Sequence, residues 1–201
     1  MLRFVWMAAL LSCICSCSSP GRTNPYESAL PAERAHFKKV PIPLPPGTPF
    51  TISQGAFGRS THHDPGHEYT WDFDVPFGTP VLSVEDGVVL QIWAPDQGGG
   101  CDPKYNEFPH NIKIRHDDGT VAQYVHIDPR VKHGERVRAG QTIALTAKNG
   151  FICTPQLDFG IYLDERHLYG SGQMRSIPLL FDGLPDGGIA HEGYRGVVPK
   201  R

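Results

Sequence analysis

The sequence has little of what would assign it to several common classes of protein. Its formal net charge is only −2, from 19 basic and 21 acidic residues, which is too small to suggest a nucleic-acid partner. No block of like charge indicates a polybasic membrane patch. The apolar run at residues 4–11 is too short to span a bilayer as a mature helix. Nucleic-acid binding and electrostatic membrane binding are therefore disfavoured.

The first 17 residues have the pattern of an export signal. Arg3 precedes the short apolar run, and three of the five cysteines come directly after it. Ile14–Cys17 resembles a bacterial lipobox, in which the cysteine becomes the lipidated N-terminus, so Cys17 is the predicted lipid site. Leu10–Cys13 is a second candidate, and an ordinary cleaved signal peptide is the alternative. The sequence thus predicts an exported periplasmic lipoprotein, and Ser18 after the lipid cysteine favours the outer membrane.

Export changes the interpretation of the two remaining cysteines. Cys101 and Cys153 are the only ones beyond the signal, and an oxidising compartment permits disulfides. We therefore predict a disulfide between Cys101 and Cys153, with two buried free thiols as the alternative.

The composition divides the rest of the chain into a tether, a domain and an extension. Prolines are frequent at residues 18–46 and favour extended, partly stiff chain, so this segment is predicted to be a tether. A β domain is expected over residues 47–170. Residues 171–201 form a C-terminal extension, whose apolar patch at residues 177–181 is expected to pack back onto the sheet as an edge strand.

Short apolar runs separated by turn residues predict antiparallel strands within the domain. Asp86-Gly87 lies in the middle of Val81–Trp93, and Asp118-Gly119 lies between alternating runs in Asn111–Ile127; both dipeptides are strong hairpin signals. At residues 157–163 apolar side chains alternate with Asp158, Gly160 and Tyr162, as expected for a strand with one buried face. The fold class is therefore all-β.

One apparent zinc motif can be set aside. His67-Glu68 begins like the helical motif H-E-x-x-H, but the fifth residue is Trp71. Pro65 and Gly66 also make a helix there implausible.

Five other blocks, read in order, are informative together. They are Thr61-His62-His63, Asp72-Phe-Asp-Val-Pro-Phe-Gly-Thr-Pro-Val81, Tyr124-Val-His126, Gly134-Glu-Arg-Val-Arg-Ala-Gly-Gln141 and Thr154-Pro-Gln-Leu-Asp-Phe159. They resemble the lysostaphin and LytM-type zinc peptidoglycan peptidases over residues 48–170. The resemblance implies an antiparallel β-sheet core of that type with long active-site loops.

The resemblance also implies a set of site residues. His62 is the predicted first metal ligand, with His63 as the alternative, and Asp72 is the second ligand. His126 corresponds to the catalytic histidine of the Y-x-H block. The implied cofactor is zinc, with another divalent cation as the alternative.

The chain departs from the family pattern at the final H-x-H pair. The catalytic histidine is replaced by Gln156, and the metal-binding histidine by Asp158. Asp158 can still ligate a cation through oxygen, and its position two residues from Gln156 places both side chains on one strand face. Two carboxylates and one histidine shift the preference toward harder ions than zinc. Gln156 cannot accept or deliver a proton, although its amide can donate a hydrogen bond to an oxyanion.

Two functions follow from this departure, and the sequence leaves catalytic activity open between them. The first is a relative that binds or acts on peptidoglycan peptides with weakened or lost hydrolysis, in a wall-binding role or one that regulates a separate cell-wall hydrolase. The second is an active metal-dependent endopeptidase that cuts peptide crosslinks. A biotinyl-carrier-like β module is a weaker third reading, because Lys148 lacks the Met-Lys setting that such carriers require.

Overall fold

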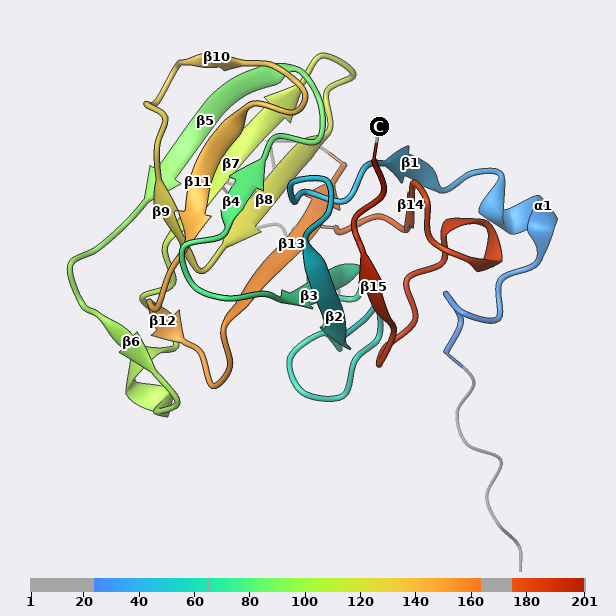
Figure 1. The fold of residues 1–201 in the computed structure, drawn as a ribbon, viewed down its shortest axis with the longest axis horizontal. Coiled ribbons are helices and arrows are strands. Elements are labelled where there is room, and N and C mark those ends of the chain that lie inside the picture. The colour runs from blue at the N-terminus through green and yellow to red at the C-terminus, as the bar shows by residue number, and fades with distance from the viewer. Residues whose placement is uncertain (1–23, 65, 164–174, 201) are drawn as a thin grey trace, which may run out of the picture.

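Eight strands form the largest sheet of the molecule, in which every neighbouring pair is antiparallel (Figure 1). The computed structural model describes residues 24–64, 66–163 and 175–200. In spatial order the strands are β10 (Arg136–Val137), β5 (Gly87–Trp93), β7 (Asn111–His116), β8 (Val121–Val125), β13 (Gln156–Tyr162), β3 (Thr70–Asp74), β2 (Pro49–Gln54) and β15 (Arg195–Val197). The predicted all-β class with an antiparallel core is confirmed.

Smaller sheets and short helices complete the described structure. A three-stranded antiparallel sheet has the order β4 (Pro80–Leu82), β11 (Thr142–Thr146), β9 (Ile127–Pro129). Two parallel pairs join β1 (Lys38–Val40) to β14 (Leu179–Phe181) and β6 (Gly99–Gly100) to β12 (Gly150–Phe151). The helices are α1 (Pro31–Arg34) and the 3-10 turns η1 (Pro103–Tyr105) and η3 (Asp186–Gly188). None of the described helices is long and apolar enough to cross a membrane.

The two faces of the large sheet have different roles. Leu157, Phe159 and Ile161 of β13 are fully buried in the core, where Phe159 packs against Tyr124 of β8. Asp158 lies between them in sequence and therefore points to the opposite face. This opposite, open face of the central strands carries the polar side chains of the candidate site.

One predicted hairpin is confirmed and the other is wrong. β7 and β8 pair around Asp118-Gly119, and Gly119 adopts the positive φ that such a turn favours. Asp86-Gly87 does not connect paired strands, because β4 pairs with β11 whereas β5 pairs with β7. A Cβ on Gly87 would lie 2.4 Å from the carbonyl oxygen of Arg115, so the glycine allows close approach of β7 rather than a turn.

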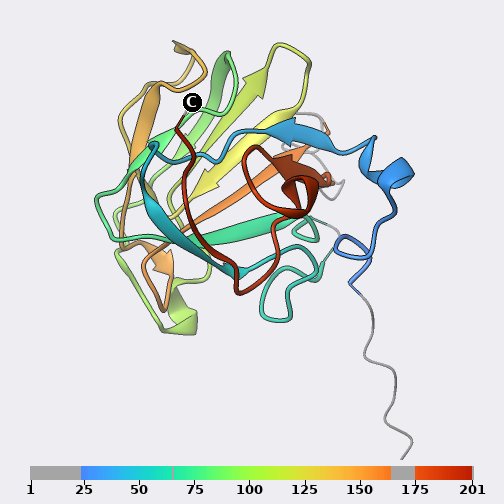
Figure 2. The same ribbon diagram turned by 45° about the vertical axis from the view of Figure 1, so that its right-hand side comes forward.

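The predicted tether needs correction over residues 24–46. Val40, Ile42 and Leu44 are each at most 2% exposed, so this proline-rich stretch is extended but packs along the domain (Figure 2). The burial of these three alternating apolar side chains fixes the segment to the domain, which its proline-rich composition does not indicate. Residues 18–23 of the predicted tether, and Cys17 with the rest of the predicted signal, lie outside the described residues.

The C-terminal extension packs on the core in a different way from the one expected. Leu179–Phe181 forms β14, which pairs in parallel with β1, while the edge of the large sheet is taken by β15, which pairs with β2. The buried Tyr26 hydroxyl donates to the Leu179 carbonyl at 2.8 Å and accepts from the Ala190 backbone N–H at 3.0 Å. The N-terminal and C-terminal segments are therefore joined to each other as well as to the sheet.

Candidate metal centre and groove

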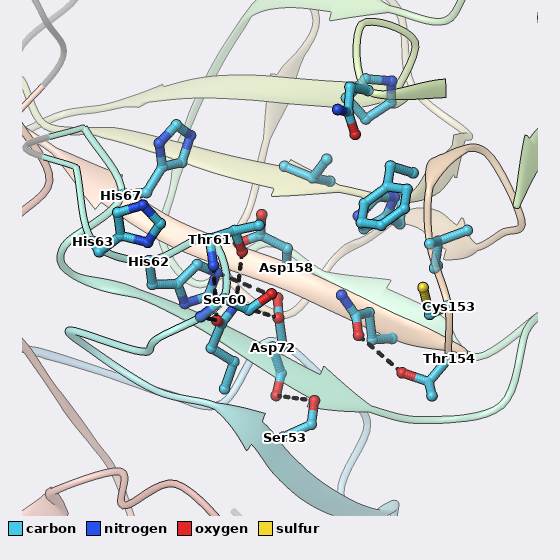
Figure 3. A pocket seen from close by; sticks show the side chains of 18 of the residues that line it. Ser53, Ser60, Thr61, His62, His63, His67, Asp72, Cys153, Thr154 and Asp158 are labelled. Atoms are coloured by element: carbon cyan, nitrogen blue, oxygen red, sulfur yellow. Dashed lines mark hydrogen bonds and ion pairs between the residues drawn. The ribbon is translucent and has the colours of Figure 1, made fainter. Parts of the chain in front are cut away.

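A groove of about 860 Å³ lies on the open face of the large sheet. Its floor contains side chains of β2, β3, β8 and β13, one rim includes residues 59–64 and His67, and the other rim includes residues 151–154. Figure 3 shows His62, Asp72 and Asp158 near the centre of this groove. The structure thus collects the predicted site residues in one place.

The three predicted metal ligands converge. Strand pairing places Asp158 of β13 directly opposite Asp72 of β3, so both carboxylates project from the same face. His62 reaches the same point from the rim loop, with its Nε2 atom 3.6 Å from Asp72 Oδ1. One potential ligand atom from each of the three residues lies within 4.8 Å of the others. The alternative ligand, His63, lines the groove but is exposed and stands outside this cluster.

Hydrogen bonds orient the buried ligands. His62 Nδ1 lies 3.2 Å from the Gly55 carbonyl oxygen; this contact requires Nδ1 to donate, which leaves Nε2 as the free ring acceptor facing Asp72. Asp72 Oδ2 accepts a hydrogen bond from Gln54 Nε2 at 3.0 Å. Asp72 Oδ1 is buried and has no hydrogen-bond partner in the described part of the chain.

Burial and the two neighbouring carboxylates shift the pKa values of the two buried ligands. Burial lowers the pKa of His62, and the charge of Asp158 only partly opposes this. For Asp72, burial first and then the Asp158 charge raise the pKa well above its ordinary value. Both side chains are therefore shifted toward their neutral forms. A divalent cation would favour ionised Asp72 and neutral His62, and would remove the repulsion between the two carboxylates.

The residues present fit a divalent metal ion. Ligand atoms about 2.1 Å from a tetrahedral ion lie about 3.4 Å from one another, close to the 3.6 Å between His62 Nε2 and Asp72 Oδ1. The Oδ1 atom of Asp72 is a buried acceptor without a hydrogen bond in the described part of the chain, and a bound cation would supply its missing partner. One imidazole nitrogen and two carboxylates form the donor set, which is richer in oxygen than a His-Asp-His set.

A second cluster of possible ligands is already neutralised by a protein cation. Glu85, His116 and Asp118 lie close enough to hold an ion, but the Lys38 ammonium contacts Glu85 at 2.8 Å and Asp118 at 2.5 Å. This cluster joins β1 to two turns of the large sheet, and we do not treat it as a metal site.

The predicted catalytic residue His126 is held in an unusual backbone conformation. Its φ is 61°, in the left-handed region that non-glycine residues seldom occupy. Its backbone N–H donates to the His110 carbonyl at 3.0 Å, and its own carbonyl accepts from the Ala147 N–H at 2.8 Å. Ring atom Nδ1 donates to the Asn149 carbonyl at 2.9 Å, and burial lowers the pKa of the ring. A neutral imidazole with Nε2 as its acceptor is therefore fixed at the groove wall.

Gln156 lies on the groove floor two residues before Asp158 and on the same strand face. Its Oε1 atom accepts a hydrogen bond from the Thr154 hydroxyl at 3.1 Å. The amide nitrogen remains able to donate to a bound molecule, whereas no atom of the side chain can exchange a proton near neutral pH.

Two supporting residues carried no recognisable signal in the sequence. Gln54 bridges Asp72 to the rim loop: its Oε1 accepts from the backbone N–H groups of Ser60 and Thr61, and its Nε2 also donates to the Thr61 hydroxyl. Asn149 accepts from His126 through its carbonyl, and its buried side chain binds backbone atoms of His110 and Ile127. Gln54 joins the rim loop to a residue 18 positions away, and Asn149 contacts residues 22 to 39 positions away, so no local motif reveals either role.

We expect Gln54→Leu to weaken binding of a divalent cation by about 10- to 100-fold, the usual range for residues that orient metal ligands. The change removes the donor to Asp72 and loosens the loop that carries His62. Competition with a chromophoric chelator measures the affinity, and Gln97→Leu, at an exposed glutamine, is the matched control. Unchanged affinity in Gln54→Leu would show that the loop and Asp72 are positioned without it.

The predicted Cys101–Cys153 disulfide is confirmed. It joins the segment around β6 to the groove rim around β12, where Gly150 and Ile152 also donate backbone hydrogen bonds to Gly98 and Gly100. The bridge therefore braces the rim that follows Asn149 and precedes Gln156.

Removing this disulfide should cost substantial stability. The two cysteines are 52 residues apart, and closing a loop of that size stabilises a fold by roughly 4 kcal/mol in the chain-entropy model. We expect the Cys101→Ser, Cys153→Ser double variant to lose about this free energy of unfolding in a urea titration. Labelling of both thiols in the unreduced native chain would show that the bridge does not form.

These features define an all-β protein with a candidate metal centre in an open groove. The model of Peptidase family M23 matches residues 66–169, slightly more than half of the chain, so the chain belongs to this family. The matched segment contains Asp72, His126, Gln156 and Asp158 but begins after His62, whose place in the cluster comes from the structure.

Individual relatives show the same similarity. The chain is 34% identical over 98 residues to the peptidoglycan DD-endopeptidase ShyC of Vibrio cholerae, covering 48% of this chain and 20% of that protein. It is 33% identical over 96 residues to the glycyl-glycine endopeptidase ALE-1 of Staphylococcus capitis, covering 47% and 24%. The solved structure of lysostaphin from Staphylococcus simulans aligns with a TM-score of 0.48 at 23% identity, covering 63% of this chain and 47% of that one. The matched region thus spans only about a fifth to a quarter of these two curated relatives.

Proposed function

We propose that this chain binds the peptide stems of peptidoglycan in the groove around a divalent cation, with hydrolysis much weaker than in a site that has histidine at position 156. The observation that carries the proposal is the contrast within one strand, where Asp158 preserves a ligand set with His62 and Asp72 while Gln156 removes a titratable group. Relatives named as a peptidoglycan DD-endopeptidase and a glycyl-glycine endopeptidase support the substrate class.

The groove residues have separate roles in this proposal. His62, Asp72 and Asp158 hold the cation, with zinc or a harder divalent ion as its identity. A cation held there would polarise a peptide carbonyl as a Lewis acid. His126, with Nδ1 fixed by Asn149, accepts a proton or a hydrogen bond at Nε2. Gln156 donates a hydrogen bond to a substrate oxygen. Because its amide cannot exchange a proton, a hydrolysis that needs two proton-transferring groups has only His126.

The alternative function is an active metal-dependent endopeptidase that cuts peptide crosslinks. The convergence of His62, Asp72 and Asp158 and the orientation of His126 favour it, because a protein that only binds has less need of these features. A regulatory role is a consequence of the main proposal: the chain would change the rate of a separate cell-wall hydrolase without cleaving substrate itself.

Binding and digestion can be measured together on purified muropeptides, with and without a chelator. We expect retention of the peptides on the metal-loaded chain with little product by liquid chromatography. Rapid chelator-sensitive cleavage would instead make the alternative correct. Absence of both binding and cleavage would contradict both functions.

We also propose that the chain is exported and anchored through a lipid on Cys17, in the outer membrane. Ile14, Ser16 and Ser18 around this cysteine support the assignment. We expect Cys17→Ser to move the chain from the membrane fraction to the soluble fraction, whereas Cys13→Ser should not. The reverse result would identify Cys13 as the lipid site.

A further inference from the structure

The open face of the large sheet continues beyond the candidate metal centre. Strand register places a row of side chains across five adjacent strands, from β3 through β13, β8 and β7 to β5. The row consists of Asp72, Asp158, Val125, Asn111 and Trp93. Directly opposite residues in antiparallel strands share a face, so Trp93 lies on the same face as the metal ligands.

A second row runs beside the first on this face. It contains Gln123 of β8, Lys113 of β7 and Gln91 of β5, which are directly paired in register. Gln123 and Val125 also line the groove. The surface formed by Gln91, Trp93, Asn111, Lys113 and Gln123, called here the β5–β8 surface, is therefore continuous with the groove.

Most polar atoms of the amides on the β5–β8 surface make no hydrogen bond within the described part of the chain. The side-chain oxygens of Gln91, Asn111 and Gln123 are buried without a hydrogen-bond partner in the described part of the chain. The amide nitrogens of Gln91 and Gln123 also make no hydrogen bond within the described part of the chain, but they are not buried and face solvent as donors. Asn111 is 9% exposed, and its Nδ2 donates only a long 3.3 Å bond to Pro109. A ligand on this face would not reach the covered oxygens, but its own oxygen atoms could accept hydrogen bonds from the amide nitrogens of Gln91 and Gln123.

An aromatic platform ends this surface. Trp93 is 47% exposed at the end of β5, three strands from Asp158. With strands about 4.8 Å apart, the indole lies about 14 Å from Asp158 along the sheet. This separation fits a short chain of sugar rings that crosses the strands.

We propose that the β5–β8 surface binds the glycan backbone of peptidoglycan, a polymer of N-acetylated hexosamines. This inference rests on the proposed function, because the peptides proposed to bind in the groove are attached to this glycan backbone. Sugar rings present apolar C–H faces that pack on an indole, while their hydroxyl and N-acetyl groups pair with amides. Neutral glutamine and asparagine side chains beside a tryptophan suit an uncharged sugar chain. A charged peptide would need ionic partners, and among the five residues that define this surface only Lys113 is charged.

Calorimetric titration of the purified chain with a peptide-free N-acetylglucosamine tetramer tests the proposal. We expect saturable binding, weakened about 10-fold or more in Trp93→Ala and roughly 3- to 10-fold in Gln91→Leu. Phe77→Ala, which removes a 41% exposed aromatic side chain outside the surface, should bind as the native chain does. Melting temperatures of all variants establish that they are folded.

A second titration with a sugar-free stem peptide separates this inference from the proposed function. We expect peptide binding to be unaffected by Trp93→Ala. Failure of the tetramer to bind while the peptide binds would overturn the glycan surface alone, as would equal tetramer binding by Trp93→Ala and Phe77→Ala. Loss of peptide binding in Trp93→Ala would show that the β5–β8 surface binds peptide, and this result would also overturn the glycan proposal. Failure of the native chain to bind the peptide would contradict the proposed function, whatever the tetramer does.

Discussion

Replacing Gln156 with histidine should increase the rate of stem-peptide cleavage by about 10²- to 10⁴-fold, the usual contribution of one general acid or base. The side chain lies on the groove floor on the same strand face as Asp158, so a histidine there would face the groove that His126 also lines. An imidazole with a pKa near neutrality can exchange the proton that an amide cannot. Turnover of a crosslinked muropeptide, followed by chromatography across pH 5 to 9, measures the effect.

Gln156→Asn is the matched control, because it keeps a non-titrating amide at the same position. It should leave the rate near that of the native chain. If Gln156→His binds metal and peptide yet cleaves no faster, the missing proton transfer is not what limits hydrolysis. A native chain that already cleaves rapidly would mean that Gln156 is part of a working variant site.

Changes at Asp158 should have comparably large effects on metal binding. Asp158→Ala removes one of three ligands, and we expect affinity for a divalent cation to fall about 100-fold or more, given several kcal/mol per ligand in protein zinc sites. Asp158→His should act in the opposite direction for zinc, since a second imidazole makes the donor set softer and less negative. The ratio of zinc to manganese affinity should therefore rise in Asp158→His.

Asp74→Ala provides the control for these variants. Asp74 projects from β3 near Asp72 but bonds to the Ser53 hydroxyl and lies outside the ligand cluster. Its removal should change affinity only slightly through the loss of a nearby charge. Equal losses in Asp74→Ala and Asp158→Ala would show that general negative charge, rather than ligation by Asp158, attracts the cation.

Much of the fold could be predicted because its signals are local. The alternation around Asp158 and the Asp118-Gly119 turn each depend on residues adjacent in sequence, and both predictions are confirmed. Asp86-Gly87 carries the same local signal, but its neighbouring strands pair with distant partners instead. The tether prediction is wrong over residues 24–46. It relied on amino-acid composition, which does not show whether the apolar side chains of a proline-rich segment are buried against the domain.

The candidate site shows the same division between local and distant signals. Asp72, His126 and Asp158 stand in blocks whose order implied their roles, and the structure brings His62, Asp72 and Asp158 together. The choice of His62 over His63 depends on the path of a rim loop, which Gln54 holds through three hydrogen bonds. Such an amide is chemically unremarkable in the sequence, and only the folded chain shows which loop it positions.

The metal content of the purified chain tests most directly whether His62, Asp72 and Asp158 form a cation site. Titration of chelator-treated protein with zinc and, separately, with manganese, analysed by mass spectrometry of the desalted complex, gives the stoichiometry. We expect one ion per native chain and none retained by His62→Ala, with His63→Ala behaving as the native chain does. Equal retention by native protein and His62→Ala, or no retention by either, would contradict the site.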